Sequence, residues 1–243
     1  MRLFSELAHL RLASTEQCIR LAGFSSYSRG KDRLRRLVYA GFLRRCFIGT
    51  ILGGKRAVYA LSSRSASLLG ILPPATKWRA DQLVTADQFI SHELHIADLY
   101  LRLRYDNLPT GIRFIRWRRF TAVISETIRL IPDGYAEVET PAGIRCMFIE
   151  MDLGSEALRI WKDKTERYLR LAASGDFEKL SGHKQFRVLV IAPTERRLLS
   201  IRKEVAAATS KIFWFASTLT INEQGLWSSV WLRPAEERRV PLM

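Results

Sequence analysis

Residues 33–45 read RLRRLVYAGFLRR, and the first part of the chain is built around this segment. Leu34, Leu37 and Val38 recur at helical spacing, so they define the inward face of a helix that the sequence predicts over residues 27–40. Basic side chains occupy the other face of that helix: Arg29, Lys31, Arg33, Arg35 and Arg36. The segment therefore predicts an amphipathic helix with one strongly cationic side.

A hairpin is predicted directly after this helix, which Gly41 ends. Two short β-rich segments follow, at residues 42–48 and 57–61. The segment between them, GTILGGKR, is rich in glycine and predicts a hairpin tip that carries Lys55 and Arg56. Two shorter helices are expected upstream, over residues 2–11 and 16–21.

Three helices followed by a hairpin are the element order of a winged helix-turn-helix, which the sequence predicts for residues 1–65. In such a domain one helix enters the major groove of DNA, and the cationic hairpin reaches a neighbouring phosphate backbone. We therefore expect DNA contacts from the basic side of the helix and from Lys55 and Arg56. A winged helix that contacts only proteins is the alternative.

The net charge also indicates a polyanionic partner. The chain of 243 residues carries 39 Lys and Arg against 24 Asp and Glu, a formal charge of +15. Residues 1–80 hold 15 basic and 3 acidic side chains, whereas residues 81–243 hold 24 and 21. An excess of this kind attracts nucleic acid more often than an anionic membrane. The alternative is a solvated basic surface without a ligand.

The rest of the chain predicts an α/β domain over residues 83–243, preceded by a linker over residues 66–82 that contains LPPATKW. One long helix and three strands, followed by helix, strand and helix, are typical of a layered α/β unit. The fold class is therefore α/β, and α+β for the chain as a whole. The helices are expected at 83–105, 156–173 and 195–209, and the strands at 113–119, 131–138, 145–151, 187–192, 213–220 and 226–231.

Cysteine usage and hydropathy indicate a cytoplasmic protein. Cys18, Cys46 and Cys146 are far apart and odd in number, which favours neither a disulfide framework nor a paired-cysteine metal site. The first residues have charges within their apolar run and do not resemble a signal peptide. The longest apolar run, residues 212–221, is too short to cross a bilayer. We therefore expect no membrane association.

Three carboxylates form the notable polar group of the second half. Asp133 follows Pro132 on one predicted strand, and Glu150 and Asp152 are two residues apart on the next, where alternation points both to one face. If the strands are neighbours, the three carboxylates meet at one edge. Such a cluster can hold Mg²⁺, which takes oxygen ligands and acts on phosphodiesters. The alternative is that these acids pair with arginines on a structural surface.

This group resembles the core of the PD-(D/E)xK nucleases, whose pattern is Pro-Asp on one strand and Glu-x-Lys on the next. The second half here reads Glu150-Met151-Asp152, so an acid stands where those nucleases keep lysine. A lysine of the following helix, Lys162 or Lys164, can supply the cation near the scissile phosphate, and Tyr168 lies one turn after Lys164. The resemblance implies an Mg²⁺ cofactor if the site is active, and none otherwise. The implied catalytic residues are Asp133, Glu150, Asp152 and Lys164, with the three acids as metal ligands.

Further motifs occur in order along nearly the whole chain: TEQCIRLAGF, RLRRLVYAGFLRR, KRAVYALSSRS, His92-Glu93-Leu94, Ile131-Pro132-Asp133, residues 148–152, Lys164 with Tyr168, and RVLVIAPTERRLLSIR. Together they resemble the replication-relaxation family of plasmids and integrative elements. The resemblance implies a winged helix fused to a nuclease-like α/β domain. It also implies DNA binding in the replication or mobilisation of a mobile element, without establishing an enzyme.

Three functions are compatible with these features. The leading one is a sequence-specific double-stranded DNA-binding protein that acts in replication, mobilisation or regulation of a plasmid or integrative element, with a relaxase or replication protein as partner. The second is an Mg²⁺-dependent endonuclease that the winged helix targets. The third is a transcriptional regulator whose second domain forms a homodimer. Cleavage of supercoiled plasmid separates the enzyme from the other two, and the location of the binding sites separates replication from transcription.

Overall fold

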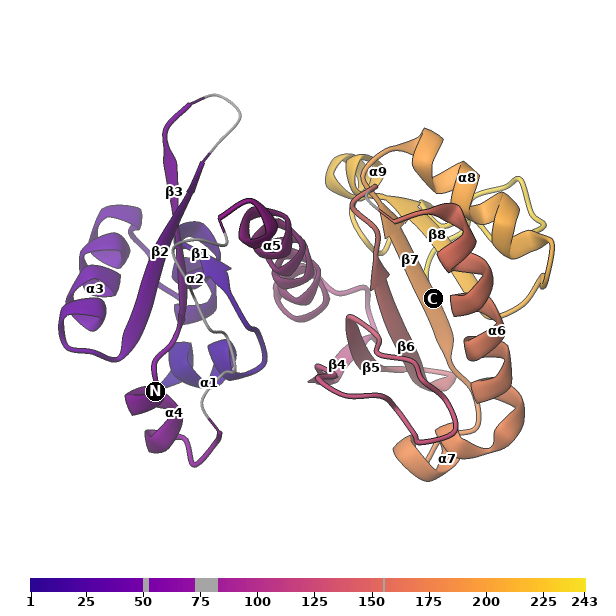
Figure 1. Ribbon diagram of the computed structural model, residues 1–243, viewed down its shortest axis with the longest axis horizontal. Helices are drawn as coiled ribbons and strands as arrows, with labels where there is room; N and C mark the ends of the chain where they lie inside the picture. The colour runs from indigo at the N-terminus through magenta and orange to yellow at the C-terminus, as the bar shows by residue number, and fades with distance from the viewer. Residues whose placement is uncertain (50–52, 73–82, 155) are drawn as a thin grey trace. The chain divides into compact units, whose positions relative to one another are not determined.

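Helices and strands form two compact units, Met1–Leu101 and Arg102–Met243 (Figure 1). The α/β class expected from the sequence is confirmed. Among the described helices, none is both long and apolar enough to pass through a lipid bilayer. The computed structural model describes residues 1–49, 53–72, 83–154 and 156–243.

The first unit combines helices with a three-stranded antiparallel sheet in the order β1-β3-β2. Three helices precede the β2–β3 hairpin, which is the element order that the sequence predicts. Part of the predicted hairpin tip, residues 50–52, lies outside the described residues. The elements are α1 (Arg2–Ala8), β1 (Ala13–Ser14), α2 (Thr15–Ala22), α3 (Tyr27–Tyr39), β2 (Leu43–Gly49), β3 (Lys55–Leu61), α4 (Ser63–Leu68) and most of α5 (Leu83–Tyr105).

Helix α3 begins and ends at local signals in its sequence. The side chain of Ser26 accepts a backbone hydrogen bond from the first turn and so caps the helix. Gly41, with a φ of 74°, lets the chain leave the helix through the left-handed region. Leu34 is fully buried, whereas Leu37 and Val38 are half-buried. The inward face is therefore centred on Leu34, and the basic side chains lie away from it.

The predicted linker over residues 66–82 is described only in part, because residues 73–82 lie outside the described chain. Its first residues belong to α4, which starts with a capping box between Ser62 and Ser65. By internal contacts, α5 groups with the first unit as far as Leu101, whereas the sequence places this helix at the start of the second domain. The predicted domain bounds stay predictions.

The second unit is built on a five-stranded sheet in the order β4-β5-β6-β7-β8. Strands β4, β5 and β6 are antiparallel, and β6, β7 and β8 are parallel. Because β5 and β6 are neighbours, the residues that enter β5 lie beside those that leave β6. The elements are β4 (Arg113–Arg118), β5 (Gly134–Thr140), β6 (Gly143–Met151), α6 (Leu158–Ser174), α7 (Asp176–Ser181), β7 (Arg187–Ala192), α8 (Glu195–Ala206), β8 (Phe213–Ser217) and α9 (Thr218–Gln224).

Helices α6 and α8 cover one face of this sheet (Figure 1). Their apolar sides share one buried cluster with Phe148 of β6, Val190 of β7 and Phe215 of β8. Trp161 and Tyr168 of α6 are fully buried in that cluster. Burial of apolar side chains therefore fixes α6 against β6, and this contact positions the polar residues between the two elements.

Near the C-terminus the structure corrects two predicted strands. The strand predicted at residues 213–220 ends at Ser217, whose side chain accepts a hydrogen bond from the backbone N–H of Thr220 and so starts helix α9. No regular strand forms at residues 226–231, where Trp231 makes an isolated bridge. Helix α7 is a further element that the sequence did not predict.

Candidate functional site

Asp133 lies at the entry to β5, which begins at Gly134 rather than at residue 131 as the sequence predicted. The backbone N–H of Asp133 donates to the carbonyl of Ile149 at 3.1 Å. Its Oδ2 accepts a hydrogen bond from the backbone N–H of Met151 at 2.8 Å. The carboxylate is therefore held beside the end of β6, next to Glu150.

Glu150 is the buried centre of the group, with 1% of its surface exposed. Its Oε1 accepts a hydrogen bond from the hydroxyl of Tyr168 at 2.6 Å, and its Oε2 lies 2.9 Å from Nζ of Lys164. Lys164 also lies 3.0 Å from Glu156. One face of α6 supplies both partners, because residues four apart on a helix are neighbours. Of the two predicted lysines, Lys164 reaches Glu150, whereas Lys162 is exposed.

The pKa of Glu150 is raised above its ordinary value. Burial is the main cause and the negative charge of Asp133 adds to it, whereas Lys164 and the hydrogen bond from Tyr168 act in the opposite direction. The pKa of Lys164 is also raised, because the charges of Glu150, Glu156 and Asp133 together outweigh the opposing effect of burial. The carboxylates of Asp133 and Glu150 therefore repel each other, and this repulsion favours a positive charge beside them.

Asp152 faces the same helix but belongs to a different ion pair. Its oxygens accept hydrogen bonds from Arg197, at 2.9 Å from Nε and 2.7 Å from Nη2. The indole N–H of Trp161, at 3.1 Å, and the backbone N–H of Gly154, at 2.6 Å, complete four hydrogen bonds. A carboxylate offers about four lone-pair sites, so these donors occupy the acceptor capacity of Asp152.

The pKa of Asp152 reflects these contacts. Burial raises it, but the hydrogen bonds from Arg197, Trp161 and Gly154 outweigh burial and bring the pKa below its ordinary value. The charged Asp152 therefore links the end of β6 to helix α8 through Arg197 and is not available as a metal ligand.

The structure thus brings Asp133, Glu150 and Lys164 together and directs Asp152 to Arg197. Asp133 and Glu150 present carboxylate oxygens, the ligands that Mg²⁺ prefers, and a cation between them would relieve their repulsion. The residues that can hold a metal here are therefore Asp133 and Glu150. Sequence reasoning missed Arg197, because no local spacing connects residue 152 with a helix that starts more than 40 residues later.

The first unit presents a second candidate site, a cationic surface on α3 and at the start of β3. Asp32 pairs with Arg35 at 2.7 Å and with Arg36 at 2.9 Å. In the part of the chain that the structure describes, Arg29 and Lys31 make no ion pair, so their charges are available to a ligand. All the predicted DNA-binding side chains are exposed: Arg29, Lys31, Arg33, Arg35, Arg36, Lys55 and Arg56.

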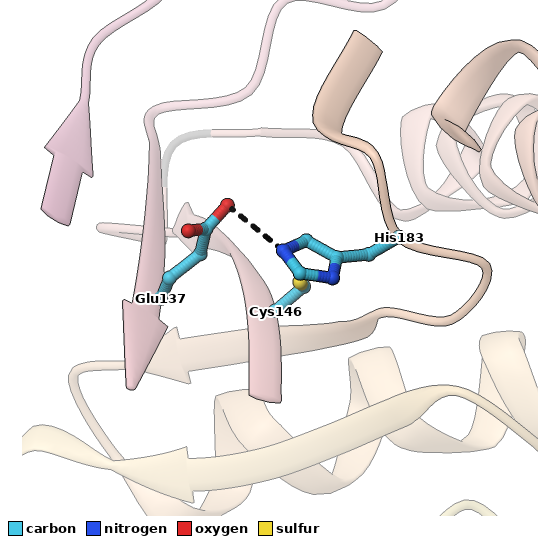
Figure 2. Close-up of side chains that lie close together, drawn as sticks. All are labelled: Glu137, Cys146 and His183. Carbon is cyan, nitrogen blue, oxygen red and sulfur yellow. Dashed lines mark ion pairs between the residues drawn. The ribbon is translucent and has the colours of Figure 1, made fainter. Parts of the chain in front are cut away.

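A third group lies on the second unit, where Glu137 of β5 and Cys146 of β6 are cross-strand neighbours and His183 follows α7 (Figure 2). Their ligand atoms lie within 4.8 Å of one another, and among the described residues no other group of three such side chains does so. Nε2 of His183 is 3.8 Å from Oε1 of Glu137. The same oxygen also accepts hydrogen bonds from Arg116 at 2.6 Å and from Tyr135 at 2.7 Å. The charge of Glu137 is therefore already balanced.

A family model matches residues 4–185, which include the cationic surface and the cluster of Asp133, Glu150 and Lys164. The family model that matches is described as Replication-relaxation. The chain belongs to the Replication-relaxation family. Membership points to a role in the replication or relaxation of a plasmid or mobile element and confirms the resemblance seen in the sequence. No curated protein and no solved structure matches the chain.

The matched range does not include every contact described above. Helix α3, the β2–β3 hairpin, Asp133, Glu150 and Lys164 lie within the Replication-relaxation match, whereas Arg197 lies beyond it. The cationic surface and the residues around Glu150 thus lie within the matched residues, and the partner of Asp152 lies outside them.

Proposed function

We propose that this member of the Replication-relaxation family is a sequence-specific double-stranded DNA-binding protein. It acts in the replication, mobilisation or regulation of a plasmid or integrative element. The observation that carries this proposal is the basic side of α3. Five of its side chains are cationic and exposed, on a helix that Leu34 anchors in the core.

The element order supports a winged helix-turn-helix. Helix α3 follows α2 after a turn at Gly23, whose φ of 71° ends α2 in the left-handed region. In this motif the second helix of the pair enters the major groove, and residues of the hairpin contact the backbone. We assign α3 as the recognition helix and β2–β3 as the wing, where Lys55 and Arg56 begin β3 with exposed side chains.

The cationic side chains of α3 can contact phosphate with little loss of existing ion pairs. Arg29 and Lys31 make no ion pair among the described residues, and the pairs of Asp32 with Arg35 and Arg36 are exposed. Exposed pairs of this kind contribute about 0 to 1 kcal/mol, so a phosphate can displace Asp32. Arginine can also bind guanine through two hydrogen bonds in the major groove, which gives sequence preference.

The test is a selection of duplex DNA from a random library with the full chain, followed by fluorescence anisotropy titrations of the selected duplex at several salt concentrations. We expect one enriched sequence and an affinity that falls steeply with salt. Arg29→Gln/Lys31→Gln should weaken binding, whereas Arg170→Gln/Arg196→Gln removes the same charge from exposed positions of the second unit and should not. Equal binding by both variants would refute the assignment of α3.

Whether the protein acts in replication, mobilisation or transcription is tested by the position of the selected sequence within the plasmid or integrative element. A position at a replication origin or transfer region supports replication or mobilisation, and a position within promoters supports the transcriptional alternative. A relaxase or replication protein and a second copy of the chain are the proposed protein partners. Affinity capture with the full chain and its mass by light scattering test these two partners separately.

A second candidate function is an Mg²⁺-dependent endonuclease, which the 2.9 Å contact between Lys164 and Glu150 favours. Asp133 and Glu150 would hold the cation, which supplies stabilisation of the negative charge that develops on a scissile phosphate. The side chain of Lys164 is 22% exposed, so its ammonium can reach a phosphodiester oxygen while Tyr168 holds the Glu150 carboxylate in place. Conversion of supercoiled plasmid to open circles by the full chain tests this candidate.

A further inference from the structure

The second unit contains a pocket at the end of the sheet opposite to Glu150. Its volume is about 360 Å³, and its walls come from the start of β6, the residues before β7 and the start of β8. Arg145 and Glu150 are five residues apart on β6, which corresponds to about 17 Å at the usual rise of a strand. The pocket is therefore separate from the site of Asp133 and Glu150.

Four cationic side chains line this pocket, and no acidic one does: Arg145, Lys184, Arg187 and Arg233. In the described chain, none of the four forms an ion pair with a carboxylate. Burial, together with the charges of Arg145 and Arg233, lowers the pKa of Arg187 to about 10. The protein thus holds like charges close together without a neutralising group of its own.

The guanidinium groups of the pocket are held in place by an aromatic ring. Arg187 lies over Trp214 with its Cζ 4.4 Å from the ring centroid, and Arg233 lies over the same ring at 4.9 Å. Arg187 also donates a hydrogen bond to the carbonyl of Leu242. Stacking on an aromatic ring restricts a guanidinium while leaving its other N–H donors available to a ligand.

One of these donors is buried and has no acceptor. The Nε of Arg233 is inaccessible to solvent and has no hydrogen-bond partner among the described residues. A buried donor without a partner costs about 1 to 3 kcal/mol, more where the group is charged. An anion in the pocket that accepts from Arg233 would remove this cost and the repulsion among the cations together.

A metal cation is the competing ligand, because Cys146 and His183 also line the pocket and lie close to Glu137 (Figure 2). Two observations disfavour it. The carboxylate of Glu137 already accepts from Arg116 at 2.6 Å. The four neighbouring positive charges also oppose a further cation at this end of the sheet.

We propose that the pocket of Arg145, Lys184, Arg187 and Arg233 binds a phosphate group. A phosphate offers several acceptor oxygens and up to two negative charges, which match the forked donors of several arginines. The phosphate can belong to a nucleotide or to the end of a nucleic acid strand, and the experiment distinguishes these sources. The proposal does not depend on DNA binding by the first unit.

Isothermal titration calorimetry of the full chain with pyrophosphate, at constant ionic strength, tests the pocket. We expect binding that Arg145→Gln/Arg233→Gln weakens at least tenfold. Arg170→Gln/Arg196→Gln removes the same charge elsewhere on the second unit and should change the affinity less than twofold. Lys184→Gln is an exposed single change that leaves the Trp214 stack in place, and it should weaken binding by threefold or more.

Competition experiments identify the source of the phosphate. A nucleoside monophosphate and an oligonucleotide with a 5′-phosphate are each titrated against bound pyrophosphate, with the same oligonucleotide lacking the phosphate as control. Displacement by the nucleoside monophosphate identifies a nucleotide as the source, and displacement by the 5′-phosphorylated oligonucleotide but not by its unphosphorylated control identifies a strand end; either result supports the proposal. Equal affinity for pyrophosphate in the pocket variant and its charge-matched control overturns it. Heat with Zn²⁺ but none with pyrophosphate overturns it in favour of a metal site at Glu137, Cys146 and His183.

Discussion

The Nζ of Lys164 lies 2.9 Å from Oε2 of Glu150, and the carboxylate that it reaches is buried within the second unit. The sequence has an acid, Asp152, two residues after Glu150, where the resembled nucleases have lysine. Helix α6 thus provides the positive charge that β6 does not. The first prediction follows from this replacement, because a buried carboxylate depends on its counter-ion.

We predict that Lys164→Met destabilises the second unit by about 3 to 5 kcal/mol, because Glu150 is left buried without its counter-ion and keeps only the hydrogen bond from Tyr168. Glu150→Gln/Lys164→Met should cost less than the sum of the two single changes, since it removes both charges. Five of the six tryptophans lie in the second unit, so urea unfolding followed by tryptophan fluorescence reports on it. Lys162→Met, an exposed neighbour, should cost under about 0.5 kcal/mol. Additive single and double variants would show that the pair is not coupled.

The second prediction concerns Asp152 and pH. The pKa of Asp152 is below its ordinary value of 3.8, so its contribution to stability is complete above that value. The contribution is lost as the pH falls through the lower pKa of the folded state. Asp152→Asn should therefore be destabilising near neutral pH, by about 3 to 5 kcal/mol because Arg197 loses its counter-ion.

The difference between the wild-type chain and Asp152→Asn should then narrow as the pH is lowered from 6 to 2.5. Urea midpoints measured across this range test the prediction, with Asp163→Asn as a control at an exposed position of α6. A difference that stays constant over the whole range would contradict the proposed role of the ion pair with Arg197.

The third prediction concerns the recognition helix. The slope of log affinity against log salt is negative, and Arg33→Ala/Arg36→Ala should reduce its magnitude by about 1.8, because each phosphate that an arginine neutralises contributes about 0.9 to that magnitude. The helix should remain folded, because both side chains are exposed. Fluorescence anisotropy at several salt concentrations measures the slope. An unchanged slope, with Arg170→Ala/Arg196→Ala as the charge-matched control, would place the phosphate contacts elsewhere.

The elements around the sites were largely predictable because their signals are local. Leu34 and the basic residues around it follow a helical period, and the alternation in β6 correctly turns Glu150 and Asp152 to the face that α6 covers. The partners of these residues depend on tertiary contacts. Spacing along the chain does not predict that Arg197 forms an ion pair with Asp152. Nor does it predict that Arg187 and Arg233 both stack on the ring of Trp214.

The fourth prediction concerns Leu34 and Leu37, for which the sequence predicts the same burial. Leu34 is fully buried and Leu37 half-buried, although the helical period assigns both to the inward face. Leu34→Ala should cost about 2 to 5 kcal/mol because it leaves a cavity, and Leu37→Ala should cost clearly less. Arg35→Ala is the exposed control, at under about 0.5 kcal/mol. Thermal unfolding followed by circular dichroism ranks the three variants, and the reverse order for the two leucines would mean that α3 is rotated.

The last prediction concerns the acids. If Asp133 and Glu150 hold Mg²⁺, the full chain should nick supercoiled plasmid in the presence of Mg²⁺ or Mn²⁺. Asp133→Asn should abolish nicking, because it removes a ligand and leaves the charge of Lys164 in place. Asp152→Asn should retain part of the activity at a temperature where it stays folded, since Arg197 rather than a cation occupies that carboxylate. Calorimetric titration with Mn²⁺ measures binding without cleavage. Heat that Asp133→Asn removes, without nicking by the wild-type chain, indicates a metal site without nuclease activity. Absence of both heat and nicking would exclude the endonuclease and leave Lys164 as the structural counter-ion of Glu150.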